Sequence, residues 1–226
     1  MVCSQSNFRI LIKAVANPML LEAQSYLKGV DPILGSVVDV IGDIKLKGRP
    51  ANFDAFVRII VSQQLSNKSA NTIFKRVKAL FPRKRITPEF LLHLGFDRLK
   101  GCGLSKSKTE YVLGLAEHFI KIPNEVSRIR RMEDVDALKT LTSLRGIGTW
   151  SASIFLLFNL KKPDIFPYGD VSLEKAISLL YGVKPKKKYT EVEGIISLWS
   201  PYRSLASLYL WEWIDRGQPE LSRSEI

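Results

Sequence analysis

Asp170 is the acidic residue best placed to do chemistry, because it follows a short turn-forming stretch. Pro167 and Gly169 precede it, and a predicted helix runs from Asp170 to Tyr181. The dipole of a helix favours an ionised carboxylate at its first residues. Such a carboxylate can stabilise a developing positive charge or orient a water molecule. From these residues alone, however, a plain helix N-cap is the favoured interpretation.

A glycine turn between two predicted helices is the second candidate, with the sequence Leu144-Arg-Gly-Ile-Gly-Thr-Trp-Ser-Ala152. Its two glycines, one residue apart, allow positive φ angles and a tight reversal of the chain. Backbone N–H groups and the start of the following helix would then be open to a phosphate oxygen. Leu144 and Ile147 are expected to anchor the turn in the core. A simple turn with a glycine C-cap fits the same pattern equally well.

The composition narrows the classes of protein to which the chain can belong. Lys and Arg number 34 against 22 Asp and Glu, a net charge of +12, which favours a polyanionic partner, either nucleic acid or an anionic membrane surface. Only two cysteines occur, so a disulfide framework or an all-cysteine metal site is excluded. The apolar runs are too short for a membrane span, and the N-terminus lacks a signal-peptide pattern. We therefore expect a protein of the reducing cell interior.

Helical periodicity runs through nearly the whole chain and predicts the elements that must position these residues. Apolar residues recur three and four apart, as in helices that pack one face on a core. Asn52 is expected to cap the first of the clear stripes. The segment 37–44 is mildly strand-like, but it does not support a sheet. An all-α fold is predicted, with helices around 53–61, 70–81, 107–120, 135–141, 150–158, 170–181 and 204–214.

The two candidate motifs together resemble a known family. Leu144 to Ala152, followed by Phe166-Pro-Tyr-Gly-Asp170, is similar to the helix–hairpin–helix, Gly/Pro-rich loop and aspartate signature of base-excision DNA glycosylases. Within that superfamily the resemblance is closest to the alkylpurine (3-methyladenine) DNA glycosylases. It covers roughly residues 15 to 216 in matching order. Three further stretches carry it: Phe53 to Val77, Gly103 to Lys108, and Pro201 to Trp211.

This resemblance implies a fold of two helical subdomains on either side of a cleft. One would span residues 51–162 and hold the hairpin, and the other would join residues 1–50 to 163–226. Asp170 would be the catalytic carboxylate beside the sugar of an extruded nucleotide. Cleavage of the glycosidic bond passes through an oxocarbenium-like state, whose positive charge a carboxylate stabilises. The same residue could still cap its helix.

The resemblance also assigns roles around that carboxylate. Aromatic residues would line the pocket for the base, because cationic alkylated purines stack well on electron-rich rings. A side chain from the turn at Gln63-Gln64-Leu65 would fill the gap that extrusion leaves in the duplex. Arg203 would lie beside the cleft and pair with a carboxylate or organise the last helix. The implied pocket residues are Trp150, Tyr168 and Trp211, the wedge is Gln64 or Leu65, and the phosphate contacts are Gly146, Ile147, Gly148 and Thr149.

The departures from the family pattern limit the chemistry. Trp150 stands where family members that also nick the strand carry a nucleophilic lysine, so we expect a monofunctional enzyme that leaves an abasic site. Four C-terminal cysteines of the iron–sulfur branch are absent. No organic cofactor is expected. A cation could be held by the backbone carbonyls of Leu144 and Ile147, as the family implies.

Two other functions stay open from the sequence. The first is a glycosylase of the same fold that acts on uracil, mismatched thymine or oxidised bases. The second is a non-catalytic module that binds DNA through the hairpin. In the favoured interpretation the partner is double-stranded DNA with a damaged base, and the protein is a monomer that binds no membrane. It would work in the nucleoid and cytoplasm or in the nucleus, depending on the organism.

Overall fold

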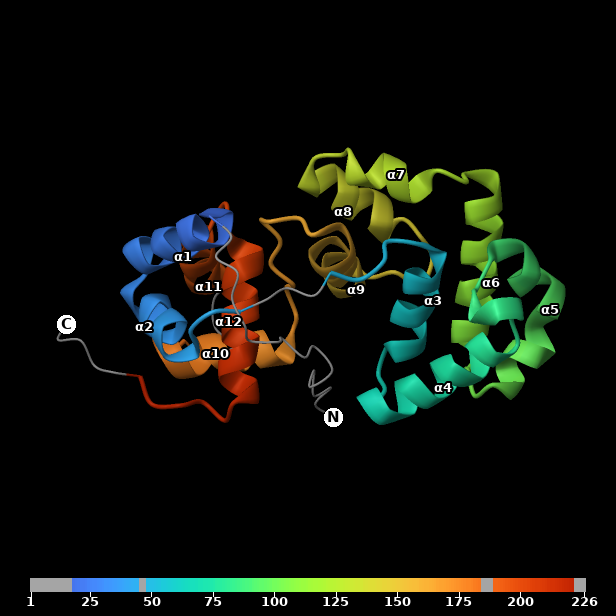
Figure 1. Ribbon diagram of the computed structural model, residues 1–226, viewed down its shortest axis with the longest axis horizontal. Helices are drawn as coiled ribbons and strands as arrows, with labels where there is room; N and C mark the ends of the chain where they lie inside the picture. The colour runs from blue at the N-terminus through green and yellow to red at the C-terminus, as the bar shows by residue number, and fades with distance from the viewer. Residues whose placement is uncertain (1–17, 45–47, 184–188, 222–226) are drawn as a thin grey trace. The chain divides into compact units, whose positions relative to one another are not determined.

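The computed structural model describes residues 18–44, 48–183 and 189–221, and all the regular structure in these ranges is helical (Figure 1). The prediction of an all-α fold is therefore confirmed. The residues on which the signal-peptide prediction rests lie outside the described ranges. The chain divides into two compact units, of which the first runs from Gly48 to Lys161. The second combines the described residues on either side of that range.

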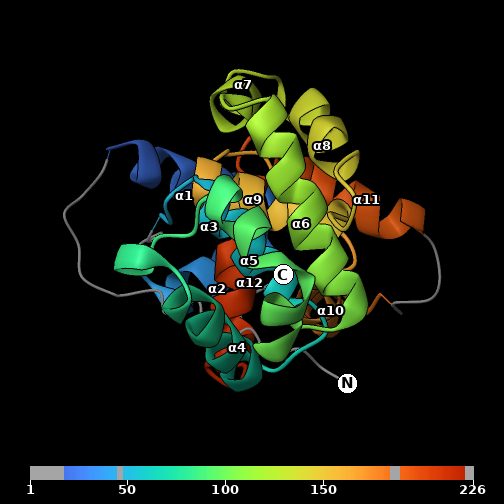
Figure 2. The same ribbon diagram turned by 90° about the vertical axis from the view of Figure 1, so that its right-hand side faces the viewer.

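The first unit packs its helices around a layer of phenylalanine rings. Phe56 is fully buried, and its ring centroid lies 5.0 Å from that of Phe119 and 4.3 Å from that of Phe155. Helices α5 and α6 lie against each other, as Figures 1 and 2 both show. The elements are α3 (Phe53–Ser62), α4 (Asn67–Ala79), the 3₁₀ turn η1 (Pro82–Lys84), α5 (Pro88–Gly101), α6 (Lys106–Lys121), α7 (Glu125–Arg130), α8 (Asp134–Thr142), α9 (Thr149–Phe155) and the π-helical turn η2 (Leu156–Leu160).

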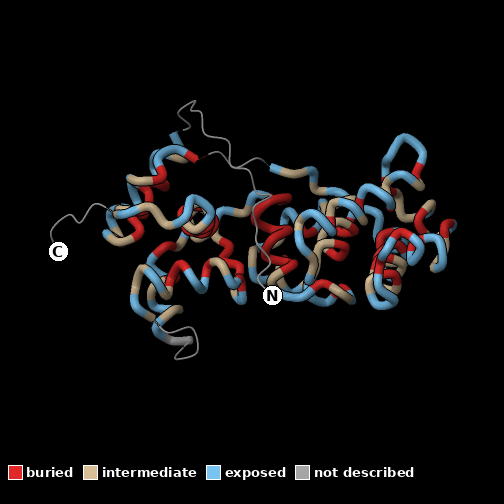
Figure 3. Tube along the Cα trace, turned by 90° about the horizontal axis from the view of Figure 1, so that it is seen from below, coloured by how far each residue is buried: buried red, intermediate tan, exposed pale blue. Residues whose placement is uncertain are grey.

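The second unit brings together segments from the two ends of the chain. Helix α12 packs against both α2 and α10, which Figure 1 shows as blue and orange ribbons beside the red one. The tube in Figure 3 alternates between buried and exposed stretches along much of its length. In α12, every residue from Ala206 to Trp211 is buried, so this part of the helix is enclosed on all sides. The elements are α1 (Pro18–Val30), α2 (Pro32–Ile41), α10 (Val171–Tyr181), α11 (Tyr189–Leu198) and α12 (Arg203–Asp215).

A buried carboxylate ties these distant segments of the second unit together. Asp31 caps α2 by accepting the Leu34 N–H at 3.0 Å on one oxygen. Its other oxygen accepts the Tyr181 hydroxyl at 2.6 Å and the Trp199 indole N–H at 2.8 Å. Buried charges persist only where such bonds replace water. Asp31 therefore joins the N-terminal helices to α10 and to the end of α11.

Local sequence signals explain where several helices begin. The Asn52 side chain accepts the Ala55 N–H at 3.2 Å, so the predicted cap of α3 is confirmed. The strand-like interpretation of residues 37–44 was wrong, because most of this segment is the second half of α2. Two start signals outweigh its β-branched residues there: the Asp31 cap and Pro32 in the first turn.

Candidate functional site

Asp170 lies at the first turn of α10 with its side chain almost fully buried, at 3% exposure. One carboxylate oxygen, Oδ1, accepts the backbone N–H groups of Ser172 and Leu173, both at 3.1 Å. The same oxygen accepts the indole N–H of Trp211 at 3.0 Å. Asp170 is thus an N-cap, as its position predicted. Three N–H donors and the positive end of the helix also stabilise a negative charge at this point.

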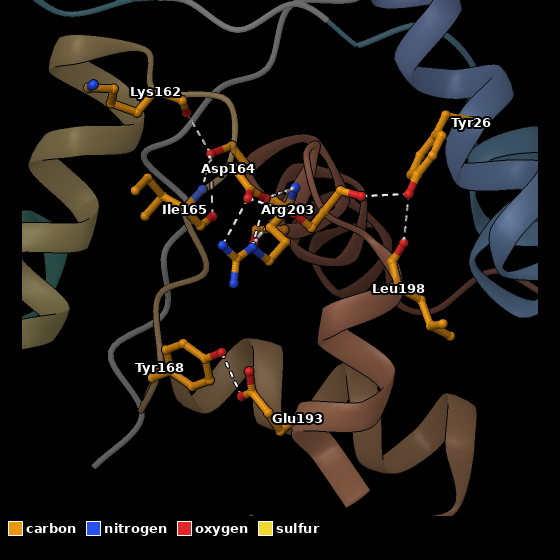
Figure 4. A network of polar contacts seen from close by, with 11 residues as sticks. Tyr26, Lys162, Asp164, Ile165, Tyr168, Glu193, Leu198 and Arg203 are labelled. Carbon is orange, nitrogen blue, oxygen red and sulfur yellow. Dashed lines mark hydrogen bonds and ion pairs between the residues drawn. The ribbon is translucent and has the colours of Figure 1, made fainter. Parts of the chain in front are cut away.

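The loop before Asp170 turns sharply, and Tyr168 lies in this loop. Gly169 has φ of +80°, in the left-handed region that favours glycine, and the Asp170 N–H donates to the Pro167 carbonyl at 3.2 Å. The Tyr168 hydroxyl donates to Oε2 of Glu193 on α11 at 2.7 Å (Figure 4). Burial and this bond raise the pKa of the Tyr168 phenol well above its ordinary value. Tyr168 therefore stays a neutral hydrogen-bond donor.

Arg203 holds the start of the same loop. Its guanidinium forms a two-pronged pair with Asp164, with Nε to Oδ1 at 2.7 Å and Nη2 to Oδ2 at 2.8 Å (Figure 4). Ser200 donates a further bond to this carboxylate at 2.8 Å. Burial alone would raise the pKa of Asp164, but the bonds from Arg203 and Ser200 bring it below its ordinary value. Pairing of Arg203 with a carboxylate was one of its two predicted uses.

The tryptophans differ in their surroundings. Trp211 is 3% exposed in α12 and touches Asp170 through its indole nitrogen, so its proposed stacking on a base stays a prediction. Trp150 is half-buried in the first turn of α9, in the other unit. Trp199 is fully buried and donates to Asp31, and Trp213 is buried and donates to a backbone carbonyl, so both serve packing.

The hairpin joins α8 to α9, and its two glycines have different tasks. Gly146 has φ of +91°, and a Cβ on it would lie 2.5 Å from Cγ of Tyr111. Gly148 has an ordinary φ of −85°, so only Gly146 uses the positive φ that both glycines allow. A Cβ at Gly148 would meet nothing within 4 Å. Gly146 is required by the fold, whereas Gly148 leaves an open approach to the backbone.

The side chains and the carbonyls of the hairpin decide what it can bind. Leu144 and Ile147 are buried, as expected of anchors. The Ile147 N–H donates to the Leu144 carbonyl at 2.9 Å, so it is already engaged in the turn. Gly148 and Thr149, both exposed at the start of α9, are the better-placed donors for a phosphate. The backbone carbonyls of the hairpin suit a hard cation. A carbonyl oxygen has two lone pairs, and the turn uses only one of those on Leu144.

The turn between α3 and α4 contacts the hairpin through a residue that the sequence did not single out. Gln63 Nε2 donates to the Gly146 carbonyl at 2.8 Å and to Ser151 Oγ at 3.1 Å. Gln64, the predicted wedge, is exposed with φ of +54°, and Leu65 is half-buried. Gln63 and Gln64 are the same residue type, and only the tertiary contact of Gln63 with the hairpin distinguishes it from the exposed Gln64.

Lys108 fixes this turn from the side of α6. Its ammonium donates to the carbonyls of Val61 and Gln63, at 2.9 and 2.5 Å, where α3 ends. Burial lowers the pKa of Lys108. The stretch Gly103 to Lys108, which the sequence linked to the family, thus positions the predicted wedge. A cavity of about 220 Å³ lies here, lined by Val61, Gln63, Gln64, Leu65, Ile73, Gly103, Leu104, Ser105 and Lys108.

Comparison with known proteins decides the family. Residues 57–201 match the HhH-GPD superfamily of base excision DNA repair proteins. The chain belongs to this superfamily. Among curated HhH-GPD relatives, DNA-3-methyladenine glycosylase 1 of Schizosaccharomyces pombe is 28% identical over 201 residues, which cover 85% of this chain and 87% of that protein. The putative DNA-3-methyladenine glycosylase YfjP of Bacillus subtilis is 29% identical over 169 residues, covering 72% and 59% of the two chains.

Solved structures agree with this assignment. The crystal structure of a DNA-3-methyladenine glycosidase from Bacillus halodurans has a TM-score of 0.76 and 31% identity, covering 84% of this chain and 88% of that one. The S. pombe 3-methyladenine DNA glycosylase in complex with abasic DNA shares the fold, with a TM-score of 0.74 and 24% identity over 88% and 99% of the two chains. The predicted family is therefore confirmed, and the roles of individual residues stay predictions.

Two findings concern other classes of site. Among residues 18–44, 48–183 and 189–221, no three His, Cys, Asp or Glu side chains gather in a way that could hold a metal ion. Within the same described part of the chain, no helix has the length and apolar character needed to cross a membrane.

Proposed function

We propose that this chain is a monofunctional DNA glycosylase that hydrolyses the N-glycosidic bond of alkylated purines of the 3-methyladenine type and leaves an abasic site. The membership in the HhH-GPD superfamily and the names of the relatives support this proposal. Its partner is double-stranded DNA with a damaged base, which it meets as a monomer inside the cell, in the nucleoid and cytoplasm or in the nucleus, depending on the organism. The excess of basic residues supports binding to a polyanion.

The observation that carries the proposal is the setting of Asp170. Three N–H groups converge on Oδ1 and fix the plane of the carboxylate. A fixed negative charge beside the sugar needs no reorganisation when the oxocarbenium-like state forms, so it lowers that barrier directly. We assign this carboxylate to the sugar or to the attacking water. A purine alkylated on a ring nitrogen leaves easily and needs little acid catalysis.

The remaining assignments extend the family resemblance to single residues. Gly148 and Thr149 hold a backbone phosphate, and Gln64 enters the gap left by the extruded base, on a turn that Gln63 and Lys108 hold in place. Trp150, Tyr168 and Trp211 contact the damaged base. A cation at the carbonyls of the hairpin would strengthen the hold on the phosphate. With no lysine at the position of Trp150, the strand is left uncut.

Incubation with alkylated duplex DNA tests this proposal. Chromatography of the supernatant should reveal released 3-methyladenine or 7-methylguanine, together with heat-labile abasic sites in otherwise intact strands. Duplexes with a single uracil, mismatched thymine or oxidised purine serve as the comparison. If only one of these other bases is released, the chain is a glycosylase of the same fold that acts on uracil, mismatched thymine or oxidised bases. If no lesion is released while the duplex is bound, the chain is a DNA-binding module.

A further inference from the structure

One hydrogen bond close to Asp170 has no task in the mechanism above. The Tyr168 hydroxyl donates to the carboxylate of Glu193 at 2.7 Å, across 25 positions of the sequence (Figure 4). Tyr168 stands two residues before Asp170, on the same turn, and Glu193 comes from α11. Both lie in the second unit, so the bond is independent of how the two units are arranged.

The Tyr168 hydroxyl lies near both a carboxylate and a guanidinium. Arg203 is held by Asp164 in a two-pronged pair. Burial and Glu193 raise the pKa of the Tyr168 phenol by more than Arg203 lowers it, so the phenol stays protonated. Glu193 is exposed and accepts the phenol O–H (Figure 4). A chain with a net charge of +12 thus places a carboxylate against a tyrosine on the turn that carries its proposed catalytic residue.

The hydrogen bond between Tyr168 and Glu193 has a chemical consequence for the base. A purine nucleoside methylated on N3 or N7 carries a positive charge, whereas hypoxanthine and ethenoadenine nucleosides are neutral. A phenol that donates to a carboxylate has a more electron-rich ring, and such a ring attracts cations more strongly. We propose that Glu193, acting through its hydrogen bond with Tyr168, biases the base site towards cationic purines and against neutral ones. This inference rests on the proposed function, and it makes Glu193 a specificity-determining residue.

The test compares two duplexes that differ in the charge of one base. The cationic duplex contains 7-methylguanine on a 2′-fluoroarabino sugar, which resists cleavage, and the neutral one contains the isostere 7-methyl-7-deazaguanine. Fluorescence anisotropy in one buffer gives a dissociation constant for each. The variants are Glu193→Gln, which keeps an acceptor but removes the charge, and Tyr168→Phe, which keeps the ring but removes the hydroxyl. Glu22→Gln, an exposed carboxylate on α1 of the same unit, is the matched control.

We expect the wild type to prefer the cationic duplex. Glu193→Gln should lose roughly three- to tenfold of that preference, the size expected of a solvent-exposed charge acting on a stacked cation. Tyr168→Phe should lose a similar factor, and the double variant should lose little more, because both changes break one unit. Glu22→Gln should keep the wild-type ratio.

The inference is overturned if Glu193→Gln weakens both duplexes equally, because that is the behaviour of a purely structural bond. A ratio unchanged within twofold, or an additive double variant, overturns it as well. Its failure differs from failure of the proposed function. In the first case wild-type protein still releases alkylated bases from DNA, and in the second case it releases none.

Discussion

Alanine at Gly146 should strongly destabilise the first unit, whereas alanine at Gly148 should hardly affect it. The left-handed φ of +91° costs an L-residue about 1–2 kcal/mol. The new Cβ would also lie 2.5–2.8 Å from Cγ, Cδ2 and Cβ of Tyr111, so the base of that side chain must move. Overpacking of this kind costs about 1–3 kcal/mol. The sum, ~2–5 kcal/mol, is a large part of the stability of an ordinary domain.

Urea unfolding, followed by circular dichroism, measures this cost. Gly146→Ala should shift the midpoint to lower urea by an amount that corresponds to ~2–5 kcal/mol, while Gly148→Ala should stay within about 1 kcal/mol of the wild type. Binding should show the reverse order, because the methyl group of Gly148→Ala obstructs the approach of a phosphate to a backbone that is otherwise intact. We expect its dissociation constant for abasic duplex to rise about tenfold, at the cost of one such contact.

Replacement of Tyr111 separates the two parts of the Gly146 effect. In a Tyr111→Ala background the clashes with Cγ and Cδ2 disappear and only the contact with Cβ remains. Gly146→Ala should then cost clearly less, close to the ~1–2 kcal/mol of the backbone angle. The reasoning would be refuted if Gly146→Ala and Gly148→Ala destabilised the protein equally. It would also be refuted if the cost of Gly146→Ala were the same with and without the tyrosine ring.

Three further predictions concern the turn, the ion pair and the class of enzyme. Gln63→Ala should lower the unfolding free energy by about 1–3 kcal/mol because it leaves the Gly146 carbonyl without its donor, whereas Gln64→Ala should lower only the excision rate; urea unfolding and a single-turnover assay separate them. The pKa of Asp164 is lowered in the folded state, so its contribution is present above the unfolded pKa and is lost as pH falls through the folded value. Melting temperatures of wild type and Arg203→Ala should therefore differ at neutral pH and converge in acid, and a constant difference would contradict this. Borohydride should trap no covalent protein–DNA adduct on lesion DNA, since Trp150 replaces the nucleophilic lysine; a trapped band on a denaturing gel would contradict monofunctional cleavage.

The helices and their cap residues were readable from the sequence because their signals are local. The stripe that begins at Phe53 lies within one helix, and Asn52 precedes it directly, so periodicity and capping rules suffice. The segment 37–44 was misread because its β-branched residues suggest a strand, while the signals that start α2 lie upstream, at Asp31 and Pro32. Tertiary context outweighed local propensity there.

The parts of the site that escaped prediction depend on contacts between distant residues. Gln63 reaches Gly146 across 83 positions, and Tyr168 reaches Glu193 across 25. No periodicity or spacing rule connects such pairs, and nothing in the local sequence sets Glu193 apart from other surface acids. The engagement of the Ile147 N–H by Leu144 was equally invisible, because it follows from the detailed path of the turn.

The direct test of the central claim is the single-turnover excision rate of Asp170→Asn on a duplex with one 7-methylguanine. Asparagine caps helices as well as aspartate does and offers Trp211 the same acceptor, so the variant should fold normally and bind abasic duplex as the wild type does. Loss of the negative charge should slow excision by at least roughly 100-fold. Excision at the wild-type rate by this variant would contradict the assignment of Asp170 as the catalytic carboxylate.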